Sequence, residues 1–216
     1  DAALARTPDD LEARNDRAVL RWQAGDRKGA QADLDRVLEL CPGYGLAHLN
    51  RGNVRRESGD LEGAIADYGR SIALDPDEPK AYERRGTALA ELGRAREALA
   101  DRGRAIAVAP WSVEPRVARA RLRFLAGDRE GALADLDQAL GLDPAHAEAR
   151  LDRAKVRRAA GDLAGCEADL ETAMASRPAD PRPWALRGAL RRGQGRLDEA
   201  ASDLDRAIEL APDRAN

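Results

Sequence analysis

A proline recurs every 34 residues along this chain. The six positions are Pro42, Pro76, Pro110, Pro144, Pro178 and Pro212, and Pro8 lies on the same spacing. A period of this length is that of one helix-turn-helix unit, which cannot bury its apolar face alone and therefore stacks on copies of itself. The spacing predicts an all-α solenoid of antiparallel helix-turn-helix repeats, each closed by a proline.

The remaining features align when each repeat is counted from place 1 to place 34. Six repeats then fill residues 11–216 and begin at Leu11, Gly45, Pro79, Val113, Ala147 and Pro181. Residues 1–10 match the last third of the second helix of a preceding repeat, so we expect a partial helix there. Within a repeat, the first helix is helix A and the second is helix B.

Place 15 is glycine in every repeat and lies between two segments with apolar residues at helical spacing. These glycines are Gly25, Gly59, Gly93, Gly127, Gly161 and Gly195. Glycine tolerates a positive φ, so it can end helix A and allow a tight turn. An aspartate follows it in four repeats, at Asp26, Asp60, Asp128 and Asp162, where its side chain can cap helix B.

Small residues at places 8 and 20 let the two helices of a hairpin approach closely. In an antiparallel hairpin that turns near place 15, level partners have place numbers that sum to roughly 31, so place 8 faces place 24. Place 24 is mostly large, with Leu34, Tyr68, Leu136, Leu170 and Leu204. We expect these side chains to fill the space that their small partners leave.

Arginine at place 7 and aspartate at place 23 should also be level across each hairpin. The pairs are Arg17 and Asp33, Arg51 and Asp67, Arg85 and Asp101, Arg119 and Asp135, Arg153 and Asp169, and Arg187 and Asp203. An unpaired buried guanidinium is costly, so we expect bidentate Arg–Asp pairs that fix the register of the repeats. The alternative is a basic ladder for an acidic polymer. The internal pairing is favoured because every arginine has an aspartate in its own repeat.

Place 11 is a second arginine in five repeats, and repeat three is the exception. There Leu89 occupies place 11, and Arg102 occupies place 24, where other repeats are mostly apolar. A charge and an apolar group have exchanged positions within one hairpin, as expected if the two places are neighbours.

Composition argues against several classes of function. The net charge is −3 with both signs interleaved, so the basic field of a nucleic-acid binder is absent. No apolar run is long enough to insert in a membrane. His48 and His146 lack partners at metal-ligand spacing, and no phosphate loop or nucleophile motif is present. We expect no enzyme, cofactor or metal, and the compartment stays open.

The small-residue columns, turn glycine, large place 24 and closing proline resemble the tetratricopeptide repeat family over residues 11–214. The resemblance implies a right-handed superhelix whose concave wall is built by helix A. The polar and aromatic residues expected on that wall to bind a partner are Trp22, Asn50, Asn53, Lys80, Arg84, Arg121, Phe124, Arg158 and Arg192. Trp22 and Phe124 would be exposed anchors for a peptide or helix, or simply ordinary exposed aromatics.

A narrower resemblance concerns family members that clamp the terminal carboxylate of a peptide tail with five polar residues. Asn50, Lys80 and Arg84 match three of those places in type and spacing. The other two fall on Asn15 and Val19, where a lysine and an asparagine would be needed. The clamp implied by the resemblance is therefore incomplete.

The two ends of the array suggest a different partner. Helix B of repeat six carries an apolar stripe of Leu204, Ala207, Ile208 and Ala211, and no capping helix follows it in this sequence. Two unlike, uncovered ends can meet head to tail and propagate into filaments or rings. The alternative is a piece of a larger protein. Among protein partners, we favour copies of the chain itself over a peptide in the groove, such as an acidic C-terminal tail.

Overall fold

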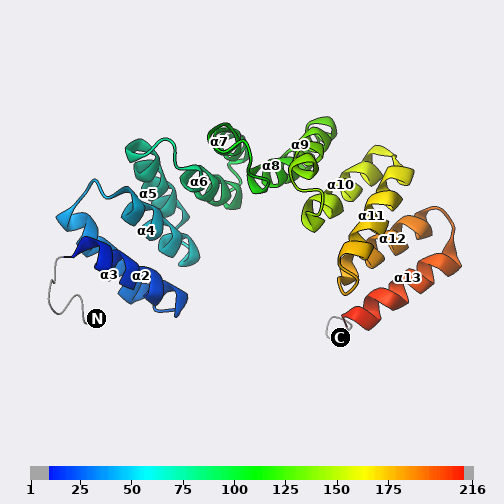
Figure 1. Cartoon of the computed structure of the whole chain (residues 1–216), viewed down its shortest axis with the longest axis horizontal. Coiled ribbons are helices and arrows are strands. Elements are labelled where there is room, and N and C mark those ends of the chain that lie inside the picture. Colours follow the sequence, from blue (N-terminus) through cyan, green and yellow to red (C-terminus); the bar gives the residue numbers. More distant parts are fainter. Residues whose placement is uncertain (1–9, 212–216) are drawn as a thin grey trace. The chain divides into compact units, whose positions relative to one another are not determined.

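The structure of the protein, a computed structural model, describes residues 10–211. Those residues form twelve α-helices and no strand, which confirms the all-α prediction. The chain divides into two compact units, Asp1–Pro110 and Trp111–Asn216, which hold three repeats each. Helices A and B of each repeat form an antiparallel hairpin (Figure 1).

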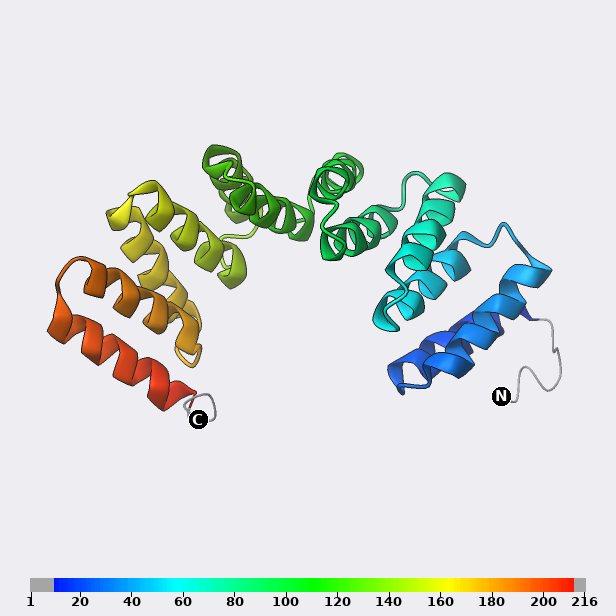
Figure 2. The same cartoon turned by 180° about the vertical axis from the view of Figure 1, so that it is seen from behind.

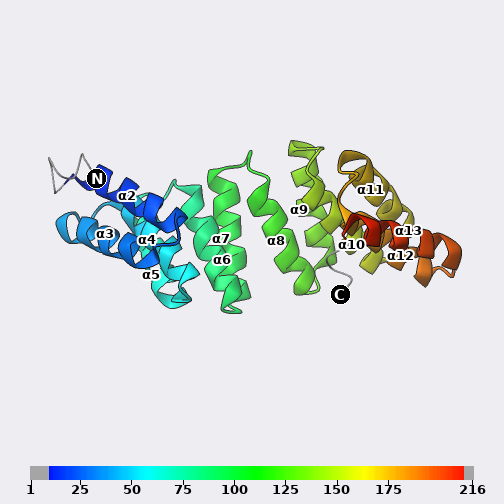
Figure 3. The same ribbon diagram turned by 90° about the horizontal axis from the view of Figure 1, so that it is seen from below.

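Unit 1 contains the hairpins of repeats one to three. Its helices are α2 (Leu11–Gln23), α3 (Arg27–Leu40), α4 (Gly45–Glu57), α5 (Leu61–Leu74), α6 (Pro79–Glu91) and α7 (Ala95–Val108). Each helix B also packs on helix A of the next repeat, α3 on α4 and α5 on α6. The pairs can be followed by colour in Figure 2, and Figure 3 shows α6 beside α7.

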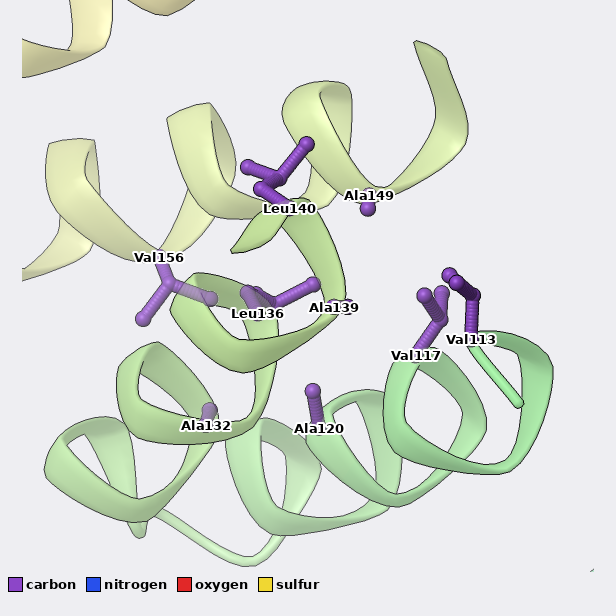
Figure 4. Close-up of a cluster of buried hydrophobic side chains, with 9 residues drawn as sticks. All are labelled: Val113, Val117, Ala120, Ala132, Leu136, Ala139, Leu140, Ala149 and Val156. Atoms are coloured by element: carbon purple, nitrogen blue, oxygen red, sulfur yellow. The ribbon is translucent and has the colours of Figure 1, made fainter. Parts of the chain in front are cut away.

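Unit 2 repeats this arrangement. Its helices are α8 (Glu114–Leu125), α9 (Arg129–Leu142), α10 (Ala147–Ala160), α11 (Leu163–Ser176), α12 (Pro181–Gly193) and α13 (Leu197–Leu210). Here α9 packs on α10 and α11 packs on α12. Side chains from α8, α9 and α10 meet around the fully buried Leu136 (Figure 4).

The turn glycines and the prolines punctuate the helices as predicted. All six place-15 glycines have φ between +75° and +87°, the left-handed region that favours glycine. Each helix B ends two residues before its proline, for example at Leu40 before Pro42 and at Leu74 before Pro76. Pro8 and Pro212 lie outside the described residues.

The cap of helix B is coupled to the residue at place 19. Asp26 accepts a hydrogen bond from the amide of Gly29 at 2.9 Å, and a Cβ added to this glycine would stand 2.1 Å from the Asp26 carboxylate. The other three aspartate caps also have glycine at place 19. In repeats three and six the cap is arginine and place 19 is glutamate, and Arg94 donates to Glu97 at 2.7 and 2.8 Å. The side chain at place 19 is therefore set by the cap.

The small place 8 and the large place 24 face each other across the hairpin. A Cβ added to Gly52 would lie 2.5 Å from the ring of Tyr68, and one added to Gly188 would lie 2.9 Å from Leu204. The aromatic ring of Tyr68 is fully buried. The predicted interlock therefore depends on the absence of a side chain at place 8.

The partial helix expected at residues 1–10 lies outside the described residues except for its last position. Asp10 is the N-cap of α2, and its carboxylate accepts a hydrogen bond from the amide of Ala13 at 3.0 Å. This residue therefore opens helix A of repeat one.

We predict that Gly52→Ala lowers the free energy of unfolding by about 1–3 kcal/mol, because the new methyl group overpacks the Tyr68 ring. Gly141→Ala is the matched control, since a Cβ there meets no atom within 4 Å. Near the end of α9 it should leave stability unchanged or raise it by up to about 1 kcal/mol. Urea unfolding followed by circular dichroism measures both, and equal effects would contradict the interlock.

Candidate functional site

Six arginine–aspartate pairs form a ladder with one rung in each hairpin. In every rung, Nε and Nη2 of the place-7 arginine donate to the two carboxylate oxygens of the place-23 aspartate at 2.5–2.9 Å. The rungs are Arg17–Asp33, Arg51–Asp67, Arg85–Asp101, Arg119–Asp135, Arg153–Asp169 and Arg187–Asp203. These are fork-to-fork contacts, the strongest geometry for this pair.

The place-11 arginines add a second guanidinium to five rungs. Nη1 donates to the same aspartate at 2.8–2.9 Å, from Arg21, Arg55, Arg123, Arg157 and Arg191. The carboxylate oxygens are therefore shared between two cations. The Asp135 side chain is 1% exposed and Arg119 is 19% exposed. This geometry supports internal pairing, because little of either charge faces solvent.

Hydrogen bonding to the aspartate favours the charged form of several place-7 arginines. The bond to the aspartate is the largest influence on the pKa of Arg51, Arg85 and Arg187, and it raises each pKa above the usual arginine range, against the opposing effect of burial. These three guanidinium groups therefore stay charged where they link helix A to helix B.

Some rungs also join neighbouring repeats. Nη1 of Arg51 donates to Asp35 of the preceding repeat at 2.9 Å, and Nη1 of Arg153 donates to Asp137 at 2.7 Å. Both carboxylates lie at place 25. The ladder therefore connects hairpins within a unit as well as the two helices of one hairpin.

Repeat three breaks the pattern in a way that the sequence did not predict. Leu89 is buried, so the apolar half of the exchange is accommodated. Arg102, however, does not bond to Asp101, which accepts from Arg85. It donates instead from Nη2 to the hydroxyl of Thr87 at 2.6 Å.

Trp22 and Phe124 are half-buried rather than exposed as predicted, and their role as anchors stays a prediction. Trp22 packs against the core cluster of repeats one and two, and its Nε1 donates to Glu57 at 2.8 Å. Phe124 packs against the cluster that includes Leu136. Residues of the neighbouring repeat therefore cover part of each ring.

Three of the predicted polar contact residues also bond within the chain. Asn50 donates to Asn15 at 2.9 Å, and Asn53 is buried and accepts from Tyr68 at 3.0 Å. Arg121 donates to Asp152 at 2.5 Å. Asn15 to Asn50, Trp22 to Glu57 and Arg56 to Glu91 are each 35 residues apart, one period plus one. Polar residues 35 apart are therefore the sequence signal from which these contacts between repeats could have been predicted.

The other predicted contact residues, Lys80, Arg84, Arg158 and Arg192, are exposed. None forms an ion pair with another residue in the range 10–211. Of the three residues that match the clamp, Lys80 and Arg84 are exposed, whereas the amide of Asn50 donates to the buried Asn15.

The end face of repeat six is an exposed apolar groove of about 370 Å³. It is lined by Pro181, Arg182, Ala185, Leu204, Ala207, Ile208 and Ala211. Ile208 is 56% exposed, whereas Met174, at the same place in repeat five, is 7% exposed because it packs against α12 with Leu190. In repeat five, the corresponding surface of α11 is covered by helix A of the following repeat, α12.

On α2, an apolar residue that is buried in other repeats is exposed. Leu20 at place 10 is 65% exposed. Val54, Val156 and Leu190 occupy the same place and are at most 4% exposed. Each packs against helix B of the preceding repeat.

Within residues 10–211, no helix has the length and apolar character needed to cross a bilayer. The same part of the chain contains no cluster of metal-binding side chains.

We predict that Asp135→Ala lowers the free energy of unfolding by about 3 kcal/mol, because Arg119 and Arg123 lose their shared acceptor. Asp101→Ala should cost less, since it leaves only Arg85 without its partner. Glu97→Ala, which removes an exposed pair with Arg94, should leave stability nearly unchanged. Urea unfolding of the three variants checks this order, and equal losses for Asp135→Ala and Glu97→Ala would contradict it.

Comparison with family models identifies the repeats. A model described as TPR repeat matches residues 52–93, and two described as tetratricopeptide repeat match residues 123–190 and 181–214. Together the matches span more than half of the chain. No curated protein sequence matches it.

Solved structures share the fold at low sequence identity. PilW, described as a widely conserved type IV pilus biogenesis factor, has a TM-score of 0.82 and 18% identity, with 95% of each chain covered. PilF of Pseudomonas aeruginosa has a TM-score of 0.79 and 18% identity over 94% of this chain and 92% of its own. YrrB, described as a TPR protein with an unusual peptide-binding site, has a TM-score of 0.67 and 19% identity over 84% and 93%. These likenesses show an all-α helical repeat solenoid.

Proposed function

The chain belongs to the tetratricopeptide repeat family, and on that premise we propose that it is a non-enzymatic protein-interaction scaffold whose copies associate head to tail. Proteins of this family and fold are typically scaffolds without catalytic activity. The partner is a second copy of the chain, which meets the end face of repeat six with its own repeat one.

The observation that carries the proposal is a carboxylate on the end helix. Asp205 lies at place 25 of α13, where the acids of inner repeats receive the place-7 arginine of the following repeat. Asp35 receives Arg51, and Asp137 receives Arg153. Asp205 forms no ion pair among the residues that the structure describes. Both its charge and the adjoining apolar groove are complementary to a following helix A.

Repeat one offers such a helix. If α2 of a second copy sat on α13 as α12 sits on α11, Leu20 would be buried against Ile208. The same register would bring Arg17 of that copy toward Asp205. Because the two faces are different, one contact leaves one free face on each molecule, and association continues into filaments or closes into rings.

We predict that a charge on either face stops this association. Leu20→Glu blocks the face of repeat one, and Ile208→Glu blocks that of repeat six, because each would bury a carboxylate in an apolar contact. Each variant alone should be monomeric by size-exclusion chromatography with light scattering, whereas the wild-type mass should rise with concentration. An equimolar mixture should form dimers only, since each variant keeps one working face.

The matched control is Leu125→Glu, which places the same charge on an exposed leucine of repeat four, away from both end repeats. It should associate as the wild type does. A wild-type chain that stays monomeric at every concentration, or a mixture that forms no dimer, would rule out head-to-tail association.

A second candidate function is that of a monomeric adaptor that binds an acidic peptide or partner helix. It is favoured by two exposed cations on α6, Lys80 and Arg84, which lie about one helical turn apart and have no ion-pair partner among residues 10–211. Exposed, unpaired cations attract an acidic ligand and steer its approach. YrrB, whose fold is similar, is described as having an unusual peptide-binding site, which supports this alternative.

A further inference from the structure

Arg102 lies outside the ladder, and the internal Arg–Asp pairing does not explain it. Its side chain occupies place 24 of α7, where other repeats hold leucine or tyrosine, and the residue is only 8% exposed. Its one hydrogen bond runs from Nη2 to the hydroxyl of Thr87 on α6, at 2.6 Å. A buried guanidinium held by a single neutral acceptor is costly, so this position calls for a negatively charged partner.

No carboxylate within residues 10–211 forms an ion pair with Arg102, although the charge of Glu83 acts on it and raises its pKa. The nearest aspartate in sequence, Asp101, already accepts two hydrogen bonds from Arg85. Arg102 forms no ion pair, and its Nε is buried without a hydrogen-bond partner. Nη1 also makes no hydrogen bond, and it is not among the buried atoms without a partner, so it reaches solvent.

The side chain of Arg102 extends from helix B to helix A across a glycine. A Cβ added to Gly86 would lie 3.5 Å from Nε of Arg102, so the guanidinium passes over the bare backbone at place 8. Repeat two uses the same route. There Tyr68 crosses Gly52 and donates its hydroxyl to Asn53 at 3.0 Å. In both repeats the place-24 side chain carries a polar group to place 9 of helix A.

Three nearby charges act on Arg102. Burial is the largest influence on the pKa of Arg102 and lowers it, Glu83 and Asp101 raise it, and the nearby positive charge of Arg84 lowers it. Arg84 is exposed and has no ion-pair partner among the described residues. Neither of these two guanidinium groups forms an ion pair with a carboxylate within residues 10–211, and the charge of each acts on the other.

We propose that Arg102, Thr87 and Arg84 form a carboxylate-binding site in unit 1 that takes an acidic side chain of a bound peptide. Guanidinium groups bind carboxylates through short, charge-assisted hydrogen bonds, and Nη1 of Arg102 is the donor still unused. Thr87 fixes the buried guanidinium in place, and Arg84 supplies a second cation from the surface. The site rests on the proposed adaptor function. It adds a buried residue of helix B, Arg102, to the residues that would bind the peptide.

The decisive variant is the double exchange Leu89→Arg with Arg102→Leu. It restores to repeat three the arrangement of the other repeats, in which a place-11 arginine bonds to the aspartate and an apolar residue faces the place-8 glycine. The net charge does not change, so any loss of binding is not a loss of general electrostatic attraction. Thermal unfolding should show a melting temperature at or above that of the wild type.

The probe is a fluorescein-labelled decaglutamate peptide, with decaglutamine as the neutral control, titrated against the full chain by fluorescence anisotropy. We expect the wild type to bind decaglutamate and the exchange variant to bind it about tenfold more weakly, as loss of a charge-assisted contact implies. Arg84→Ala should also weaken binding, and decaglutamine should bind to none of these proteins.

The outcomes separate the site from the function on which it rests. Equal binding of decaglutamate by the wild type and the exchange variant would overturn the Arg102 site but leave the adaptor function standing. No binding by the wild type would overturn both. Head-to-tail association is measured without peptide and is unaffected by either result.

Discussion

The interaction on which the rest of the structure depends is the buried arginine–aspartate rung within each hairpin. The columns of small residues bring helices A and B close together. The rung fixes their register, because a nearly buried aspartate such as Asp135 binds Arg119 in one bidentate geometry and accepts a further bond from Arg123. Sliding one helix along the other would leave buried charges unpaired, which costs far more than a slipped apolar contact. The links from Arg51 to Asp35 and from Arg153 to Asp137 extend this constraint to the next hairpin.

Repetition explains how far the sequence alone could predict the fold. The helices, the turns and the rungs recur at fixed places, so six copies of the same evidence support each prediction. The aspect that failed was exposure. Trp22 and Phe124 were placed by their position within one repeat, whereas their burial is decided by contacts with neighbouring repeats. The contact of Arg102 could not be predicted for a related reason. Its side chain reaches Thr87 at place 9 of helix A, whereas an arginine at place 11 reaches the aspartate of the rung.

Departures from the repeat pattern indicate which positions do more than hold the repeats together. Arg102 replaces an apolar residue and lacks an acidic partner among the described residues. Leu20 and Asp205 keep the repeat pattern, but each lies on a face that an inner repeat would cover. Leu20 and Asp205 have the chemistry of internal contact residues but are exposed, and Arg102 is a buried charge without an ion pair among residues 10–211. We therefore assign binding to these three positions. The remaining arginines and aspartates of the ladder belong to the architecture.

The central claim is that the rungs are strong internal pairs, and a double-mutant cycle on one rung tests it most directly. The free energies of unfolding of the wild type, Arg119→Met, Asp135→Asn and the double variant give the coupling between the two side chains. We predict a coupling of about 2 kcal/mol or more, because both charges are largely buried and bidentate. A coupling below about 0.5 kcal/mol, the size typical of exposed pairs, would contradict the account.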